Sequence, residues 1–209
     1  MRIQTKDIAQ TFNREVIFKN VTLDLKAPDT IAVLGGNGSG KSTFLKILSG
    51  KSMPASGQIT YETRGKKIAH EALYPHVSMC APYLGIYEQL TLNELVAFHF
   101  KFKSTVKNLS KAAIPELLNL QAHADKNIEK YSSGMKQRVK LGLAVLSATP
   151  LLLLDEPFSN MDEANQKMMS DLILQHNTNR LTIICTNHQS NELQLCRRKI
   201  NIEAYKQTL

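Results

Sequence analysis

The chain has 209 residues, of which 43% are hydrophobic and 21% charged, and its formal net charge at pH 7 is +8. This length predicts one compact unit that can bury a substantial core. The three cysteines show no C-x-x-C spacing, which argues against a cysteine metal site or a disulfide framework and favours a reducing cytosol.

Neither end of the chain suggests export or membrane insertion. The first 30 residues hold acidic and basic side chains throughout, without the apolar core of a signal peptide. The most apolar stretch, residues 141–154, is interrupted by Thr149-Pro150 and is too short to span a bilayer. We therefore expect a cytoplasmic protein.

The amino-terminal part of the chain is typical of antiparallel strands. Residues 2–27 alternate apolar and polar side chains in short runs. Residues 57–70 have the pattern of a hairpin that turns near Arg64-Gly65. Between them, residues 30–34 are short, apolar and β-branched, which predicts a buried parallel strand.

A glycine-rich loop follows that strand and matches the phosphate-binding pattern G-x-x-x-x-G-K-S at residues 35–42. Its glycines let backbone N–H groups point at phosphate oxygens, and a helix predicted at 41–49 adds the positive end of its dipole. Lys41 would reach the β- and γ-phosphates, and the hydroxyl of Ser42 would face magnesium. The residues expected to contact the nucleotide here are Gly35, Gly36, Asn37, Gly38, Ser39, Gly40, Lys41, Ser42 and Thr43.

From residue 91 to about 149 the pattern becomes helical. Three stretches, 91–100, 111–120 and 132–148, have the spacing of amphipathic helices. Ser132 or Ser133 is expected to cap the last of them, because serine side chains accept from the free N–H groups of the first turn.

The segment L-L-L-L-D-E-P at 151–157 predicts the second half of the nucleotide site. Four leucines suit a strand buried on both faces, and Asp155 would emerge at its carboxyl end, where α/β sheets place ligands. Asp155 would hold magnesium, directly or through water, and Glu156 would polarise the attacking water. Pro157 would end the strand, which keeps both carboxylates at its tip. The pair predicts ATP hydrolysis as well as binding.

Six motifs in this order resemble the ATP-binding cassette of ABC transporters, over essentially the whole chain. Besides the two segments above, Y-S-S-G-M-K-Q-R-V at 131–139 resembles the family signature LSGGQ. Residues 159–162 resemble the D-loop, and residues 186–188 resemble the segment that carries the switch histidine. Phe12 lies where the family carries an aromatic ring that stacks on adenine.

The resemblance implies an α/β fold, the P-loop NTPase fold with a RecA-like core sheet, an N-terminal antiparallel β-subdomain and an inserted helical subdomain. The single ATPase domain would span 1–209. Within it, residues 1–82 and 150–209 would form the core with the β-subdomain, and 83–149 the helical subdomain.

The resemblance also implies a head-to-tail dimer, either a homodimer or a pairing with a second cassette, that sandwiches two ATP molecules with Mg²⁺. Ser132 and Gly134 of one chain would contact the γ-phosphate held by the other. In that site His188 would donate to the γ-phosphate and act in catalysis together with Lys41 and Glu156.

One position departs from the family pattern. The family usually has a glutamine at the end of a strand before the helical subdomain, where it touches magnesium and relays the nucleotide state to the membrane partner. Counting back from Leu90-Thr91 puts that position at Pro82, whose side chain offers no ligand. The open alternatives are that Gln89 or a water molecule substitutes, or that the loop sits differently.

Much of the excess positive charge is local. Lys101, Lys103, Lys107 and Lys111 follow one another closely, and three basic residues stand at 197–199. This pattern fits either a solvated face or proximity to anionic lipid headgroups beside a membrane partner. Nucleic-acid binding is not expected, because the chain shows no aromatic interleaving, reading helix or zinc spacing.

Two classes of function fit these features. The first is the motor subunit of an ABC transporter, peripheral on the inner face of the cell membrane and working with separate integral-membrane permease subunits. Export is favoured over import, because a short cassette resembles exporter-type motors, and the sequence names no substrate. The second is a soluble cassette ATPase in assembly or repair, which Pro82 favours because the missing glutamine belongs to the membrane relay.

Overall fold

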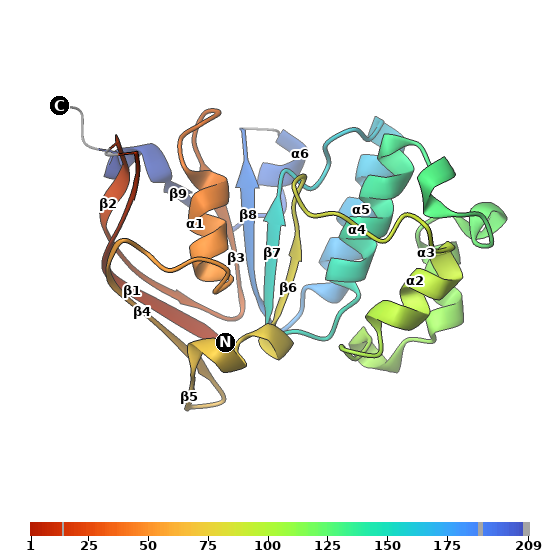
Figure 1. Cartoon of the computed structure of the whole chain (residues 1–209), viewed down its shortest axis with the longest axis horizontal. Helices are drawn as coiled ribbons and strands as arrows, with labels where there is room; N and C mark the ends of the chain where they lie inside the picture. Colours follow the sequence, from red (N-terminus) through yellow and green to blue (C-terminus); the bar gives the residue numbers. More distant parts are fainter. Residues whose placement is uncertain (14, 188–189, 207–209) are drawn as a thin grey trace.

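The computed structural model describes residues 1–13, 15–187 and 190–206, and it contains two β-sheets (Figure 1). The antiparallel sheet has the strand order β2-β1-β4-β5. Its strands are β1 (Arg2–Phe12), β2 (Glu15–Lys26), β4 (Ser56–Thr63) and β5 (Lys66–Ile68). The turn between β4 and β5 is the predicted hairpin turn at Arg64-Gly65, and both residues have the positive φ that such a turn requires.

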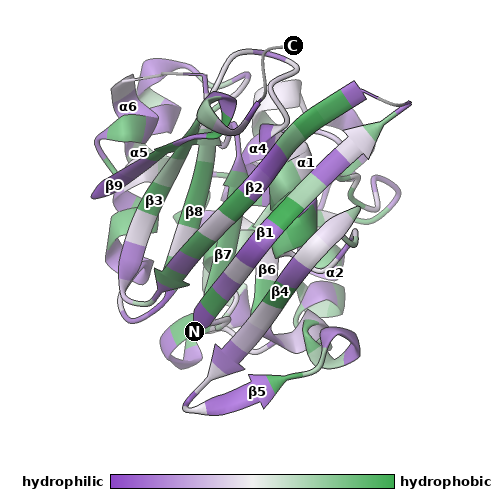
Figure 2. Ribbon diagram, turned by 90° about the vertical axis from the view of Figure 1, so that its left-hand side faces the viewer, coloured by the Kyte–Doolittle hydropathy of each residue, from purple (hydrophilic) through white to green (hydrophobic). Residues whose placement is uncertain are grey.

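The second sheet is parallel throughout, with the order β6-β7-β8-β3-β9. Its strands are β3 (Asp29–Leu34), β6 (Val77–Cys80), β7 (Leu151–Asp155), β8 (Leu181–Thr186) and β9 (Arg198–Asn201). Every residue of β7 and β8 is buried, as expected of strands covered on both faces. Figure 2 shows that β7 and β8 consist mainly of hydrophobic residues, whereas hydrophobic and hydrophilic residues alternate along β1 and β2.

Six α-helices surround this sheet in the described part of the chain. They are α1 (Lys41–Leu48), α2 (Leu92–His99), α3 (Ile114–Leu117), α4 (Ser133–Val145), α5 (Glu163–His176) and α6 (Ser190–Leu193). Helix α1 lies between the two sheets, and α2 to α5 lie beyond the other face of the parallel sheet (Figure 1). Among the described residues, no helix combines the length and apolarity needed to cross a membrane.

Two hydrophobic clusters hold these layers together, and β7 divides its leucines between them. Leu151 and Leu153 join the cluster formed with α1 and the antiparallel sheet. Leu152 and Leu154 join the cluster formed with α2 to α5. Because successive side chains of a strand point to opposite faces, an unbroken leucine run is what a strand between two apolar layers requires.

The helix beginnings follow the sequence closely, but one predicted helix is much shorter than expected. Thr91 forms a capping box with Glu94 at the start of α2, and Ser132 caps α4 by accepting from the Met135 N–H at 3.2 Å. The stretch 111–120 contains only the four-residue α3, preceded by a short 3-10 turn. Pro115 explains why α3 begins only at Ile114, because proline fits the first turn of a helix but cannot donate inside one. The left-handed φ of 52° at Asn119 ends the helical stretch soon afterwards.

The basic cluster after α2 is only partly a surface feature. Lys103 donates from Nζ to the carbonyls of Tyr74 at 2.9 Å and Val77 at 2.6 Å. Burial lowers the pKa of Lys103 to about 8. This lysine therefore fastens the segment before β6 and does not belong to a solvated or lipid-facing surface, unlike the exposed Lys101 and Lys107.

Candidate functional site

The phosphate loop joins β3 to α1 at the carboxyl edge of the parallel sheet, as the sequence predicts. Gly40 stands directly before α1 with a φ of 98°, a left-handed conformation that favours glycine. A Cβ there would also lie 2.4 Å from Cγ2 of Ile17 on β2, too close for any side chain. The loop encloses a cavity of about 230 Å³. It is lined by Ile17, Asn37, Gly38, Ser39, Gly40, Lys41, Ser42, Thr43 and Glu156.

Lys41 is only 5% exposed, and its ammonium group is held inside the loop. Nζ donates to the carbonyl oxygens of Gly35 at 2.7 Å and Gly36 at 2.9 Å, and also to Oδ1 of Asn187. The loop backbone thus fixes the position of a positive charge beside its own inward-facing N–H groups. This arrangement suits an anionic phosphate group.

Asn187, which directly follows β8, links the two halves of the site. Its Nδ2 donates to Oδ1 of Asn37 at 2.6 Å and to Oε1 of Glu156 at 2.8 Å, while its Oδ1 accepts from Lys41. One amide therefore sets the relative positions of the loop, the lysine and the carboxylate. The sequence pattern predicts no separate role for Asn187. Its position at the carboxyl end of a central strand, where α/β sheets bind ligands, is the feature that could have indicated one.

Asp155 has the surroundings expected of a magnesium ligand. It ends β7, is 2% exposed, and its Oδ2 has no hydrogen-bond partner among the described residues. Burial raises the pKa of Asp155, a hydrogen bond from Ser42 lowers it, and the nearby charge of Glu156 raises it again. An unpartnered, buried carboxylate oxygen beside a hydroxyl fits a small hard cation that takes oxygen ligands.

The rest of the magnesium shell would come from the nucleotide. No group of three or more histidine, cysteine, aspartate or glutamate side chains that could hold a metal occurs in the part of the chain that the structure describes. Magnesium at phosphate-transfer sites is usually held by one or two carboxylates together with phosphate oxygens and water. Ser42 and Asp155 therefore fit this role without further protein ligands.

Glu156 turns away from its neighbour because the backbone changes conformation between them. Its φ is 46°, which is uncommon for a residue other than glycine, and its N–H donates to the Cys185 carbonyl at 2.9 Å. Asp155 continues the strand, whereas the side chain of Glu156 enters the phosphate-loop cavity. The strained residue thus places the two carboxylates in different surroundings, which suits different roles.

In the loop after β6, Pro82 and its neighbour Tyr83 are both exposed. The Tyr83 ring lies 4.3 Å from Nζ of Lys46 on α1. Burial, and after it the charge of Asp155, raises the pKa of Tyr83. The count from Leu90-Thr91 to Pro82 therefore stays a prediction, and Tyr83 is a second candidate for the position beside the metal.

Other predicted residues lie away from the phosphate-loop cavity of the same chain. Phe12 is 69% exposed near the end of β1, and Ser132 is exposed at the start of α4, on the opposite side of the parallel sheet from α1 (Figure 1). Gly134 packs so closely on the D-loop that a Cβ would lie 2.7 Å from the Asn160 carbonyl oxygen. His188 lies outside the described residues.

A buried carboxylate that the sequence analysis did not single out ties the D-loop to α6. Oε1 of Glu192 accepts from the Phe158 N–H at 3.3 Å, and burial raises the pKa of Glu192. Its side chain is fully buried. Glu192 therefore positions the segment that follows Asp155 and Glu156.

Comparison with known proteins agrees with this geometry. A family model described as "ABC transporter" matches residues 18–159. The linearmycin resistance ATP-binding protein LnrL of Bacillus subtilis is 29% identical over 94% of this chain and 64% of its own length. The spermidine/putrescine import ATP-binding protein PotA of Thermotoga maritima is 31% identical over 91% of this chain and 52% of its own length. The chain thus spans only about half to two thirds of these relatives.

A solved structure shows the same fold at lower sequence identity. A dimeric ATP-binding cassette in a post-hydrolysis state, bound to ADP and phosphate, superposes with a TM-score of 0.80 at 20% identity. The match covers 96% of this chain and 95% of that one. The expected α/β P-loop NTPase fold is therefore confirmed.

Proposed function

The chain belongs to the ABC transporter family, and from this premise we propose that it is an ATP-hydrolysing motor subunit that works as a nucleotide-sandwich dimer beside a membrane permease. The observation that carries the proposal is the separation of roles between two adjacent carboxylates. Asp155 is buried next to Ser42 with an unpartnered oxygen, whereas Glu156 faces the phosphate-loop cavity and accepts from Asn187.

The chemistry follows from that separation. Backbone N–H groups of the loop and Lys41 would bind the β- and γ-phosphates, and Ser42 and Asp155 would hold Mg²⁺, which would supply charge neutralisation at the phosphate oxygens. Glu156 accepts a proton from the attacking water, and Asn187 keeps its carboxylate at the cavity. Asn187 also orients Lys41, so both groups meet the γ-phosphate from fixed positions.

The size of the cavity supports a dimer. At about 230 Å³ it falls below the 300–1,000 Å³ typical of pockets that enclose a whole small ligand. It can therefore hold the phosphates but leaves much of a nucleotide uncovered. Ser132 is exposed at the positive end of α4, and a second copy of the chain would bring it onto the γ-phosphate. The exposed ring of Phe12 remains available to stack on adenine.

A membrane partner is supported by exposed aromatic side chains beside α2. Tyr87, Phe98 and Phe102 are all exposed and contact one another edge to face, with ring centroids 5.3 Å and 5.4 Å apart. Contiguous exposed apolar groups of this kind mark interaction surfaces. We propose that this aromatic patch contacts the permease, which places the chain on the inner face of the cell membrane.

The transport direction is not part of the proposal. The relatives include one named for resistance and one named for import, so their names give the expectation of export no support. A soluble cassette ATPase without a channel remains the competing function, and the aromatic patch is the feature that favours transport over it.

Affinity purification from detergent-solubilised membranes tests the proposal. We expect the tagged chain to co-purify with a polypeptide that has several apolar segments long enough to span a bilayer. Phe98→Ser with Phe102→Ser should lose that polypeptide while the ATPase rate of the isolated chain is unchanged. Leu174→Ser, at an exposed position on α5, is the matched control and should retain it. Active ATPase with no such polypeptide in any preparation would support the soluble alternative.

A further inference from the structure

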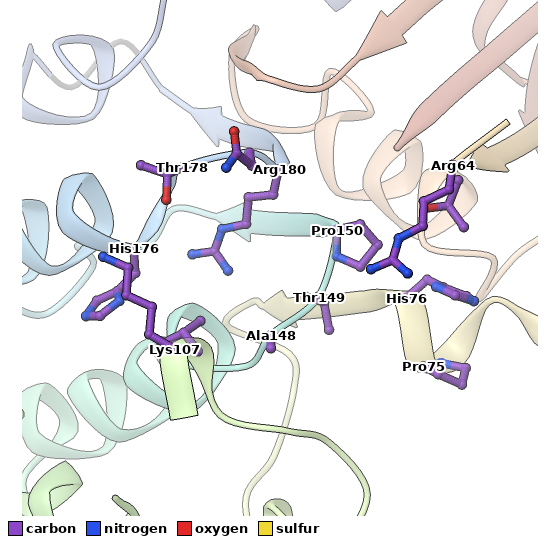
Figure 3. Close-up of a pocket in the computed structure, with 13 residues that line it drawn as sticks. Arg64, Pro75, His76, Lys107, Ala148, Thr149, Pro150, His176, Thr178 and Arg180 are labelled. Atoms are coloured by element: carbon purple, nitrogen blue, oxygen red, sulfur yellow. The ribbon is translucent and has the colours of Figure 1, made fainter. Parts of the chain in front are cut away.

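A second cavity, of about 500 Å³, lies at the opposite end of the parallel sheet from the phosphate loop (Figure 3). Three of its lining residues directly precede adjacent strands: His76 before β6, Pro150 before β7 and Arg180 before β8. Further lining residues come from the β4–β5 turn, from the loop after α2 and from the end of α5. Five separate segments of the chain therefore meet at the amino ends of these strands.

The lining of this amino-end pocket is basic. It includes Arg64, His76, Lys107, His176 and Arg180, and the described residues that line it include no aspartate or glutamate. Figure 3 shows the Arg64 side chain reaching toward Pro150, the Arg180 side chain extending away from Pro150 toward the side of His176, and His176 close to Lys107. Positive groups on several walls of one recess create a field that attracts anions.

Arg180 is the most unusual member of this set. It is 4% exposed, and it donates to the carbonyls of Val145 at 3.0 Å and Ser147 at 3.3 Å. Its Nε has no partner, and none of the ion pairs between described residues includes it. Burial lowers the pKa of Arg180 to about 10. A buried guanidinium without a counter-charge is costly, so a bound anion would stabilise it.

His176 is a second lining residue whose surroundings are positively charged. Its Nδ1 is buried without a partner among the described residues. Burial lowers the pKa of His176, and the charges of Lys107 and Arg180 lower it further. Figure 3 shows His176 beside Lys107 and on the same side of Pro150 as Arg180.

Capping of helix ends accounts for only part of the arrangement. Helix α4 ends at Val145, whose carbonyl accepts from Arg180, so this guanidinium offsets the negative end of the α4 dipole. Arg64 comes from a hairpin turn and Lys107 from the loop after α2, and neither follows a helix that ends at the pocket. Both are exposed, and neither forms an ion pair with another described residue.

We propose that the amino-end pocket binds a small, soluble, multiply charged phosphate compound, separately from the ATP held by the phosphate loop. The exposed guanidinium of Arg64 matches the geometry of phosphate oxygens, and Arg180 adds a buried positive charge whose Nε has no partner among the described residues. The exposed Thr178 and the partly buried Thr63 add hydroxyl groups to the lining. The volume lies in the range of small-molecule sites.

Titration calorimetry with inorganic pyrophosphate tests this proposal, because pyrophosphate can occupy both sites. Lys41→Ala weakens the phosphate loop, so we expect the variant to retain one pyrophosphate site. Adding Arg64→Gln and Lys107→Gln should weaken that site at least about tenfold, the effect of losing two charge-assisted contacts. The matched control adds Lys66→Gln and Lys67→Gln, which remove the same charge from exposed positions on β5 outside the pocket, and should change the affinity less than about twofold.

Two outcomes would overturn the proposal. One is the absence of pyrophosphate binding by folded Lys41→Ala, with folding checked by circular dichroism. The other is an equal loss in the control variant, because net charge alone would then explain binding. A second measurement uses the unchanged chain saturated with Mg²⁺–ADP, which should still bind one pyrophosphate with the same dependence on Arg64 and Lys107.

Discussion

Positively charged side chains lie at both ends of the parallel sheet, but the groups that surround them differ. At the carboxyl end, Lys41 donates to loop carbonyls and to Asn187, and two carboxylates stand nearby. At the amino end, Arg180 is buried near His176 and Lys107, and the pocket's described lining contains no carboxylate. A catalytic end needs acids that hold a metal and accept a proton, whereas a binding end needs cations alone. The difference suggests one end for hydrolysis and the other for recognition.

Removing the proposed base should break the catalytic end most completely. Glu156→Gln keeps the shape of the side chain but cannot accept a proton, so ATP turnover should fall by roughly two to four orders of magnitude while ATP still binds. Steady-state phosphate release and nucleotide binding measure the two effects. Glu163→Gln, exposed in the first turn of α5, should retain the wild-type rate. Near-normal turnover by Glu156→Gln would remove this residue from the role.

Removing the link between the two halves should have a smaller effect. Asn187→Ala keeps the side chains of Lys41 and Glu156 but removes the amide that hydrogen-bonds to both of them. We expect kcat to fall about 10- to 100-fold, the range for misplaced catalytic groups, with a smaller change in KM. An unchanged kcat would mean that the amide contacts do not position these groups during turnover.

Two adjacent substitutions test which residue of the loop after β6 lies beside the metal. Tyr83→Gln should place an amide beside Asp155 and lower the magnesium concentration needed for half-maximal ATPase by about a few fold, because the metal shell gains an oxygen ligand. Pro82→Gln changes the adjacent, exposed residue and should leave the magnesium titration unchanged. If Pro82→Gln alone shifted the magnesium titration, Pro82 would be the residue beside the metal, as the count from Leu90-Thr91 predicts.

The smallest expected effect concerns stability. Because burial raises the pKa of Asp155 above its unfolded value, the charged carboxylate destabilises the fold at pH values above its folded pKa. Asp155→Asn should therefore raise the melting temperature at pH 7 by about 2–4 °C, equivalent to about 1 kcal/mol, while abolishing hydrolysis. The gain should disappear below the unfolded aspartate pKa of about 3.9, where both states are protonated. A lower melting temperature at pH 7 would contradict the account.

The sequence predicted the parts of this molecule that depend on local pattern. The leucine run of β7, the loop before α1 and the Ser132 cap all follow from side-chain type and spacing. Counting along the chain does not fix which residue of the loop after β6 meets the metal, because an unpaired loop has no periodicity that sets its register. The same limit applies to the contacts of Asn187 with Asn37 and Lys41, which join residues 150 and 146 positions apart.

The amino-end pocket could not be predicted from the sequence for a different reason. Arg64, Lys107 and Arg180 look like scattered surface charges along the chain, and only the order of strands in the sheet brings them together. Arg180 in particular directly precedes β8, a position with no distinctive motif. Burial of a long cationic side chain depends on the neighbours that cover it, which single-chain periodicity does not specify.

The central claim is that two copies of this chain close around ATP with Ser132 opposite the phosphate loop. The most direct measurement is the molar mass of Glu156→Gln by gel filtration with light scattering, with and without Mg²⁺–ATP. We predict the 23.4 kDa monomer without nucleotide and twice that mass with it, and no dimer when Ser132→Arg is added. Nucleotide-bound Glu156→Gln that stays monomeric, or a dimer indifferent to Ser132→Arg, would contradict the claim.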